Sequence, residues 1–291
     1  MEGSAQKVLW PGDGLTRADL IAYYEAVAPF MLPYLKDRPV TVEVFPDGIG
    51  GTRFFRRWRP DDAPDWMRSV PYQPVTVPEP RSLILIDDLR GLRWWVERGA
   101  IAFHTWACRL PDVDHPDQAI FDLDPGRGAD FEAVLAAALV LRDWLHRQGL
   151  EGYARTSGGQ GMHVVVPLHP VHSFDQVRAW VKRVAEDLAS THEDLMAVAH
   201  GATHRGDRVT IDHAQNSVGR NTATTYTVRG LPGAPVAAPV TWREVAAHRL
   251  RPGRFTLRTM PARLRRRGDV WAAMHTRAFN VPDLARGHAA P

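Results

Sequence analysis

The sequence predicts a globular protein that mixes α-helices and β-strands. Apolar segments such as SLILIDD (82–88) and the residues leading into FDLDPG (121–126) have the length and composition of buried strands. Between such segments lie stretches with helical periodicity that begin at helix-capping pairs, for example Thr16 with Asp19. With 291 residues, of which 44% are hydrophobic and 24% charged, the chain can bury a large core as one large or two small domains.

Composition excludes several classes of protein. The sequence has no run of 18 apolar residues and no long apolar N-terminal stretch, so we expect neither a membrane span nor a signal peptide. A single cysteine, Cys108, excludes a disulfide framework and a cysteine-type zinc site. These features favour a cytoplasmic location.

Arginine supplies almost all of the positive charge, since lysine occurs only at positions 7, 36 and 182. Eight arginines and no acid occur between 249 and 267. Such a run predicts a surface for nucleic acid or polyphosphate, because guanidinium groups bind phosphate in a bidentate manner. The alternatives are a merely solvated basic face and a GC-rich genome that enriches arginine throughout.

The first part of the chain predicts a helix and two strands. The helix begins after Thr16 and has Pro33 near its end, and PVTVEVFPDG (39–48) alternates like a strand that closes in a turn. The next segment, GGTRFFRRWRP (50–60), interleaves arginines with Phe54 and Phe55. It predicts either a surface that stacks bases and holds phosphates or a strand with one apolar face.

The middle part continues this alternation. Residues 60–80 are proline-rich and predict irregular structure, and 82–88 predicts a strand followed by a short helix over 89–98. A further strand over 100–110 places His104 and Trp106 on one face. A single strand histidine is most often structural.

FDLDPG (121–126) is the segment around which the predicted site is built. On a strand, Asp122 and Asp124 point to the same face and Leu123 points into the core, before Pro125 and Gly126 end the strand. Two carboxylates held so close repel each other, and a divalent cation such as Mg²⁺ or Mn²⁺ would compensate. The pair alone is also typical of a solvated turn. A calcium loop is excluded, because its position 12 would be Ala133 rather than glutamate.

A glycine-rich loop follows the next predicted helix, which spans 131–148 with Asp130 as its N-cap. In YARTSGGQGMHVVVPL (153–168), two strand-like pieces flank the loop 157–161. Its glycines allow backbone N–H groups to line an anion-binding nest, although a hairpin turn with positive φ explains them equally well. The sequence is neither a Walker A loop nor a dinucleotide-binding fingerprint.

The last third supplies a candidate third acid. A capping box at Ser173 starts a helix to about Leu188, and His192, His200 and His204 form a weak metal pattern that Gly201 interrupts. RVTIDHAQN (208–216) predicts a strand. On it Val209 and Ile211 point to one face, and Thr210 and Asp212 point to the other. A polar strand or loop over 219–230, a linker-like segment over 231–240 and a short helix after Thr241 precede the basic run.

Several segments occur together in a characteristic order. They are KVLWPGDGLTRADLIAYY (7–24), FHTW (103–106), FDLDPG (121–126), SGGQGMHVVVPL (157–168), IDHAQN (211–216), VRGLPGAPVAAPVTW (228–242) and FTLRTMPARL (255–264). In this order and spacing the chain resembles the polymerase domain of bacterial ligase D proteins, part of the archaeo-eukaryotic primase superfamily. The resemblance runs nearly from end to end and includes no ATP-dependent ligase or nuclease module.

The resemblance implies an α+β fold with an RRM-like mixed or antiparallel sheet, helices and a second, smaller sheet layer. It implies a single primase-polymerase domain over 1–291, either free-standing or part of a larger protein. Within it we expect a DNA- and 5′-phosphate-binding part over 1–60, a catalytic core over 80–245 and a basic C-terminal segment over 246–291.

By family position, two Mn²⁺ or Mg²⁺ ions bind three acids, Asp122, Asp124 and Asp212. The residues implied for the incoming nucleotide are His104, Ser157, Gly158, Gln160, His163, Arg205, Gln215 and Arg229. Those implied for DNA and its downstream 5′-phosphate are Lys7, Arg17, Phe54 and Phe55. The chain departs from the family at Gln160, where the family usually carries lysine, and at Arg17, which also replaces a usual lysine. The region of Glu43 and Val44 is less basic than in the family, which puts 5′-phosphate binding in question.

The sequence therefore predicts a metal-dependent DNA or RNA polymerase that extends primers or fills gaps with NTPs or dNTPs. Family behaviour implies a preference for ribonucleotides, use of Mn²⁺, and DNA repair by non-homologous end joining with Ku and a separate ATP-dependent ligase, at the nucleoid. Priming is a further implied activity. The alternatives are a non-catalytic DNA-end-binding factor that recruits partners, and a metal-dependent phosphoesterase.

Overall fold

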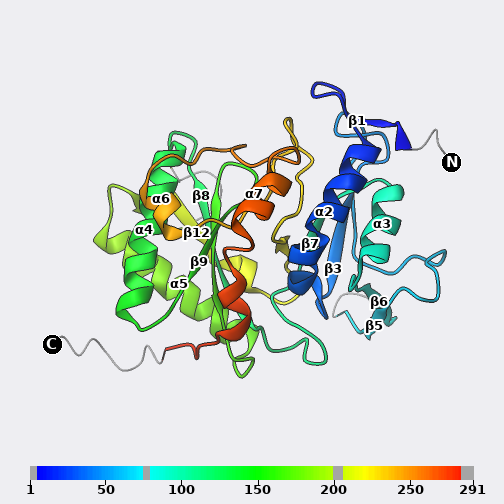
Figure 1. Cartoon of the computed structure of the whole chain (residues 1–291). Helices are drawn as coiled ribbons and strands as arrows, with labels where there is room; N and C mark the ends of the chain where they lie inside the picture. Colours follow the sequence, from blue (N-terminus) through cyan, green and yellow to red (C-terminus); the bar gives the residue numbers. More distant parts are fainter. Residues whose placement is uncertain (1–4, 75–78, 199–205, 283–291) are drawn as a thin grey trace.

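The computed structural model of the chain describes residues 5–74, 79–198 and 206–282. Two β-sheets lie side by side, with helices against the outer side of each (Figure 1). The elements in chain order are β1 (Val8–Trp10), β2 (Leu15–Thr16), α2 (Arg17–Leu35), β3 (Val40–Val44), β4 (Phe54–Arg56), β5 (Ser69–Tyr72), β6 (Arg81–Ile84), α3 (Leu89–Glu97), β7 (Ala100–Thr105), β8 (Gln118–Pro125), α4 (Phe131–Arg147), β9 (Tyr153–Thr156), β10 (Met162–Pro167), α5 (Phe174–Thr191), β11 (Met196–Ala197), β12 (Val209–Asp212), η1 (His213–Asn216), β13 (Thr222–Ala223), α6 (Trp242–Ala246), α7 (Met260–Arg267) and η2 (Ala272–Thr276). Helices combined with largely antiparallel sheets confirm the predicted α+β class.

The sheet that carries FDLDPG has five strands in the order β11-β12-β8-β10-β9. β8 is at its centre and pairs antiparallel with both β12 and β10. Phe121 and Leu123 of β8 are fully buried, and the Phe121 ring lies 5.3 Å from the Trp180 ring of α5. Because side chains alternate along a strand, Asp122 and Asp124 point to the face opposite α5.

The other sheet has six strands, with β13-β7-β3-β6-β5 in line and β4 paired to β3. Helix α2 packs on one face, where the Tyr24 ring lies 5.2 Å from the ring of Phe103 on β7. Strand alternation turns the neighbouring His104 to the opposite face, where it meets Glu43 of β3. Both sheets therefore carry apolar side chains towards their helices and polar ones on the other side.

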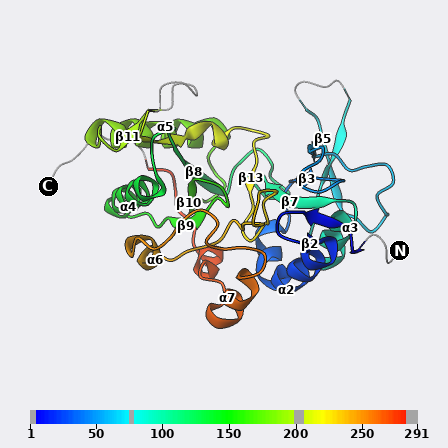
Figure 2. The same cartoon turned by 90° about the horizontal axis from the view of Figure 1, so that it is seen from above.

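One segment, residues 222–240, joins the two sheets. At its start β13 pairs with β7. At its end the N–H of Thr156 donates to the carbonyl oxygen of Ala238, and the N–H of Val240 donates to that of Ala154, which extends the edge of β9. In Figure 2 this segment lies between the two sheets. It carries Arg229 to the glycine-rich loop, as described below.

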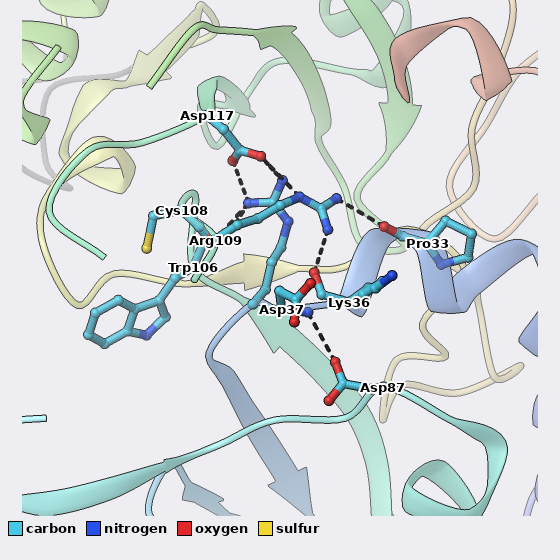
Figure 3. A network of polar contacts seen from close by, with 9 residues as sticks. Pro33, Lys36, Asp37, Asp87, Trp106, Cys108, Arg109 and Asp117 are labelled. Atoms are coloured by element: carbon cyan, nitrogen blue, oxygen red, sulfur yellow. Dashed lines mark hydrogen bonds and ion pairs between the residues drawn. The ribbon is translucent and has the colours of Figure 1, made fainter. Parts of the chain in front are cut away.

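A buried polar network fixes the loop that leads into β8 (Figure 3). Arg38, with a side chain only 2% exposed, donates two hydrogen bonds of 2.6 Å to the carboxylate of Asp117. Arg109 donates to Asp117 at 3.1 Å and to the carbonyl oxygens of Pro33 and Lys36 at the end of α2. The start of the central strand is thus held against the other half of the molecule.

Local sequence signals locate most helix starts correctly. Reciprocal capping boxes are present at Thr16, Ser173 and Thr241, and Asp130 caps α4. Each side chain accepts a hydrogen bond from a backbone N–H that the first turn cannot satisfy internally.

Two predictions of local structure need correction, and one helix lies where no element was predicted. The predicted strand 208–216 ends at Asp212 and continues as the 3-10 helix η1, because the Asp212 carboxylate accepts a hydrogen bond from the N–H of Ala214 and turns the chain. The predicted irregular region 60–80 contains β5, and the basic run contains α7.

Two further findings concern the predicted exclusions. Among the described residues, no helix combines the length and the apolar character that crossing a membrane requires. His200 and His204, the weak metal pattern, lie outside the described residues.

Candidate active site

The predicted acids meet at the centre of the five-stranded sheet. Asp212 on β12 is the register partner of Asp122 on β8, and Asp124 pairs with Thr210. Directly opposite residues on antiparallel strands point to the same face, with Cβ atoms about 5 Å apart. Asp122, Asp124 and Asp212 therefore share one face, although 88 residues separate Asp124 from Asp212 in the sequence.

Asp122 and Asp212 each have a polar contact. Within the part of the chain that the structure describes, the only basic residue that pairs with either of them is a histidine. His163 Nε2 lies 3.2 Å from Asp122 Oδ1, and the backbone N–H of Ala214 donates to Asp212 Oδ1 at 2.9 Å. Asn216 clamps the same strand, because its side-chain amide bonds both the N–H and the carbonyl of Ile120 at 2.8 Å.

The donor set suits a hard divalent cation, since Mg²⁺ and Mn²⁺ favour carboxylate oxygens. Within the described residues, no three His, Cys, Asp or Glu side chains are already arranged around one point for a metal. One oxygen of Asp122 and one of Asp212 take part in hydrogen bonds within the protein. The three acids thus have the right ligand atoms for a divalent cation and lie on one face of the sheet. Their side chains are not arranged as a complete coordination shell.

The glycine-rich loop lies against Asp124. A Cβ at Gly161 would overlap the carbonyl oxygen of Leu123 and lie 3.3 Å from Asp124 Oδ1. Within the loop, the Ser157 hydroxyl accepts hydrogen bonds from the N–H groups of Gly159 and Gly161, at 3.1 and 3.3 Å. These two amides are therefore satisfied by the loop itself, while Gln160 is exposed to solvent.

Arg229 reaches the same loop from the linking segment. It donates to the carbonyl oxygen of Ser157 at 2.8 Å, and its stem lies where a Cβ at Gly158 would be, 2.6 Å from Arg229 Cγ. Gly158 also has a φ of +74°, which an L side chain rarely adopts. Arg229 Nε is buried and has no hydrogen-bond partner among the described residues, whereas the residue as a whole is partly exposed beside the loop.

Burial and two nearby acids act in opposite directions on the pKa of Arg229. Desolvation lowers the pKa of its guanidinium, and the negative charges of Glu43 and Asp122 oppose that shift. Glu43 belongs to the six-stranded sheet and Asp122 to the five-stranded sheet. The Arg229 cation therefore interacts with acids of both sheets.

His104 is placed by the six-stranded sheet. Its Nε2 lies 3.2 Å from Glu43 Oε2, and the exposed ring of Phe55 packs edge-on at 5.8 Å. Burial lowers the pKa of His104, opposed by the hydrogen bond to Glu43. For Glu43, burial alone would raise the pKa, but His104, Arg229 and Arg53 lower it below its ordinary value. Because a carboxylate only accepts hydrogen bonds, His104 Nε2 is the donor in this contact.

Arg155 is a site residue that the sequence analysis missed. It lies on β9 opposite His163, is 4% exposed, and donates from Nε to His163 Nδ1 at 3.0 Å. Burial lowers the pKa of His163, and Asp122 opposes this shift. The available signal was a charged residue in the middle of an otherwise strand-like YART segment, directly before the glycine-rich loop.

The remaining predicted residues lie at the borders of this site or away from it. Gln215 is half-buried on η1, next to Asp212. Lys7 and Arg17 are brought together by the β1–β2 hairpin, where the N–H of Arg17 bonds the carbonyl of Lys7 at 2.9 Å. Lys7 also pairs with Asp47 at 2.8 Å, and Arg17 is 7% exposed. Arg205 lies outside the described residues.

Comparison with known proteins agrees with this architecture. A sequence model of the family described as LigD, primase-polymerase domain, matches residues 16–271. The polymerase domain from Mycobacterium tuberculosis ligase D, solved in complex with DNA, superposes with a TM-score of 0.88 at 30% identity, covering 95% of this chain and 98% of that one. The α+β fold is therefore that of the archaeo-eukaryotic primase-like domains.

Curated relatives are longer proteins. The multifunctional non-homologous end joining protein LigD of Pseudomonas aeruginosa is 30% identical over 269 residues, which are 92% of this chain and 32% of the relative. The corresponding LigD of Mycolicibacterium smegmatis is 32% identical over 253 residues, 86% of this chain and 33% of the relative. The bifunctional LigD of Bacillus subtilis is 29% identical over 91% of this chain and 42% of its own length. The chain thus spans between a third and two fifths of these relatives.

Proposed function

Because this chain belongs to the LigD primase-polymerase domain family, we propose that it is a metal-dependent nucleotidyltransferase that extends the 3′ end of a DNA primer. The observation that carries this proposal is the pairing of Asp212 with Asp122, which brings the third acid onto the face shared by Asp122 and Asp124. A turn of solvated acids would not require a partner acid from a strand almost 90 residues away.

The reaction joins the primer to the α-phosphate of a nucleoside triphosphate. The 3′-oxygen forms a bond to the α-phosphorus while the bond to the oxygen that bridges the α- and β-phosphates breaks. Pyrophosphate leaves, and the hydroxyl proton passes to solvent. Two divalent cations, Mn²⁺ or Mg²⁺, would lower the pKa of the 3′-hydroxyl and neutralise the pyrophosphate. Asp122, Asp124 and Asp212 would hold them.

The protein's own residues would bind and orient the nucleotide. Arg229, a partly exposed cation beside the glycine-rich loop, would bind a phosphate oxygen. Ser157, Gly158, Gln160 and His163 would add contacts from the loop and β10, and His104 would add one from the six-stranded sheet. Gln215 and Arg205 complete the proposed nucleotide contacts.

DNA would approach across the N-terminal part. Lys7 and Arg17 on the β1–β2 hairpin would hold a downstream 5′-phosphate, and the exposed Phe55 with Phe54 would stack on the template. Five arginines of the C-terminal segment are exposed and form neither an ion pair nor a side-chain hydrogen bond among the described residues, so they would contact the duplex backbone; these are Arg249, Arg251, Arg254, Arg265 and Arg266.

The biological setting is proposed from the relatives, which are named for non-homologous end joining. In that setting the protein would act at the nucleoid on gapped DNA or broken ends, filling short gaps with ribonucleotides or deoxyribonucleotides. Ku and a separate ATP-dependent ligase would be its partners. The single-domain organisation, with DNA-binding, catalytic and basic parts, is proposed on the same basis.

A primer-extension assay tests the proposal. Gapped duplexes with and without a 5′-phosphate are incubated with NTPs or dNTPs and with Mn²⁺ or Mg²⁺. We expect extension that requires a divalent ion and is lost in Asp122→Ala, while Asp87→Asn, far from the carboxylates and paired with Arg68, behaves as the wild type. Extension that persists in Asp122→Ala would contradict the assignment. Release of phosphate without incorporation would indicate the phosphoesterase.

A non-catalytic DNA-end-binding factor is the second candidate, and Gln160 is the observation that favours it. An amide cannot supply the point charge that a lysine gives a triphosphate. This candidate predicts tight binding of DNA ends without extension under any metal and nucleotide condition.

A further inference from the structure

Four polar side chains on neighbouring strands form a single row across the five-stranded sheet. Arg155 on β9 is the register partner of His163 on β10, and His163 is the partner of Asp122 on β8. Asp122 in turn is the partner of Asp212 on β12. Because opposite residues share a face, the row runs from a cation on the edge strand β9 to the two acids on β8 and β12.

The contacts along the row fix the protonation of His163. The Arg155 guanidinium has N–H donors and no acceptor, so its Nε–H must donate to His163 Nδ1, at 3.0 Å. A ring nitrogen that accepts a hydrogen bond carries no proton, so the proton of the neutral imidazole is on Nε2. Nε2 lies 3.2 Å from Asp122 Oδ1 and therefore donates to that carboxylate.

Arg155 is itself immobilised by the protein. It is 4% exposed, donates a second hydrogen bond to Thr225 Oγ1 at 3.0 Å, and lies 5.7 Å from the centre of the Trp271 ring. Its burial and these contacts hold the guanidinium in a fixed orientation towards His163. The guanidinium contacts neither carboxylate in an ion pair, which distinguishes it from the arginines elsewhere in the molecule that bind acids directly.

We propose that Arg155 is a positioning residue that acts through His163, holding the Nε2–H tautomer so that Asp122 is oriented for the divalent cation. This inference rests on the proposed function for the identity of the cation. Residues that orient a metal ligand from behind typically change metal affinity about 10- to 100-fold when they are replaced.

The tautomer can be measured on the unaltered full-length chain. With ¹⁵N-labelled histidine and His163→Gln for assignment, NMR of the imidazole nitrogens distinguishes a protonated Nε2 from a protonated Nδ1. We expect His163 as the Nε2–H tautomer at neutral pH in the metal-free protein. A protonated Nδ1, alone or with Nε2, would overturn the proposal without any variant having to fold.

Metal affinity tests the second half. Mn²⁺ titration followed by electron paramagnetic resonance compares the wild type with Arg155→Met, for which we expect affinity to fall about 10- to 100-fold. Arg155→Lys keeps a donor and a positive charge, and should recover part of the loss. Arg263→Met is the matched control, since Arg263 is a similarly buried arginine, 7% exposed, that binds Glu244 instead. It should lose stability and keep its Mn²⁺ affinity.

The two proposals fail in different ways. Wild-type protein that binds Mn²⁺ but extends no primer would contradict the polymerase and leave the role of Arg155 intact. A folded Arg155→Met protein with wild-type Mn²⁺ affinity would contradict the positioning role, even if the wild type extends primers. Absence of Mn²⁺ binding that depends on Asp122 would overturn both.

Discussion

The molecule contains two sets of aspartates, and their partners differ. In the network of Figure 3, Asp117 meets Arg109, and it also binds Arg38. Asp37 and Asp87, also drawn there, share Arg68 at 3.0 and 2.8 Å. At the centre of the five-stranded sheet, Asp122 meets the imidazole of His163, and Asp212 meets a backbone N–H. The first set is matched by guanidinium groups, whereas Asp122 and Asp212 form no ion pair with a guanidinium group among the described residues.

The difference separates structural acids from acids that can hold a ligand. An acid that is already paired with arginine gains little by binding a cation, and removing it leaves a buried positive charge. Acids that face each other with neutral donors repel one another until a cation arrives. The type of partner, rather than the number of acids, therefore distinguishes the two regions.

The largest expected effect comes from removing an acid of the second set. Asp122→Asn should reduce primer extension more than about 100-fold, since it removes a metal ligand rather than a residue behind one. The free energy of unfolding without metal should change little, because relief of the repulsion between Asp122 and Asp212 opposes the lost attraction of Asp122 for the buried Arg155 and Arg229. Extension assays and urea unfolding measure both. A large loss of stability would mean that Asp122 is a structural acid.

The opposite result is expected for the first set. Asp117→Asn leaves Arg38 and Arg109 without their anionic partner, and should lower the free energy of unfolding by about 3–5 kcal/mol. Asp87→Asn, in a more exposed pair, should cost less than about 1 kcal/mol. The folded fraction of both variants should extend primers at the wild-type rate. Equal losses of stability in the two variants would contradict the stronger structural role of Asp117.

Glu244 is another acid paired with arginine, and its contribution to stability should depend on pH. Burial would raise its pKa, but hydrogen bonds from Arg263 and Thr241 lower the pKa to about 2. An acid whose pKa is lowered by folding stabilises the fold at pH values above its unfolded pKa, here about 4.3. This contribution is lost as the pH falls towards 2. The stability of Glu244→Gln should be lower at pH 7 by up to about 3 kcal/mol and should fall less between pH 4.5 and 2. Parallel pH profiles for the two proteins would contradict this.

The exposed arginines of the C-terminal segment should affect DNA binding more modestly. Met260 and Leu264 of α7 are buried and Arg263 and Arg267 bind Glu244, so Arg265 and Arg266 point outwards. Arg265→Glu combined with Arg266→Glu should weaken duplex binding and reduce the slope of affinity against salt by roughly 2. The same reversal at Arg178 and Arg183 on α5, beyond the other face of the five-stranded sheet, should leave the slope unchanged.

The smallest expected change is a gain. Gln160→Lys adds a charge at an exposed loop position, so the KM for the nucleotide should fall about 2- to 5-fold. Unchanged steady-state kinetics would show that residue 160 does not approach the triphosphate. A protein inactive as wild type and active as Gln160→Lys would support the second candidate.

What the sequence could predict was local. Capping boxes gave helix starts at Thr16, Ser173 and Thr241, and period-two alternation placed Asp122 and Asp124 on one face. α7 escaped prediction because its eight residues include four arginines and too few apolar positions for a stripe. β5 escaped because Pro71 interrupts a short strand.

The strand pattern made Asp212 a candidate third acid, but its convergence with Asp122 and Asp124 was predicted from the family resemblance. Nothing local to Asp212 shows that it pairs with Asp122, since register is set by the whole sheet. Arg155 escaped notice because its role depends on strand order, with His163 between it and the acids. Likewise, eight arginines in a run suggested one basic surface, yet Glu244 binds two of them, and a third, Arg258, donates to the backbone carbonyl oxygen of Asp13.

The most direct test is the anomalous diffraction signal of Mn²⁺ in crystals of the protein soaked with the ion and a nucleoside triphosphate. The account predicts manganese peaks bounded by carboxylate oxygens of Asp122, Asp124 and Asp212, next to the triphosphate at Arg229. Manganese bound elsewhere, or a triphosphate seated in the site with no metal at these three carboxylates, would contradict it.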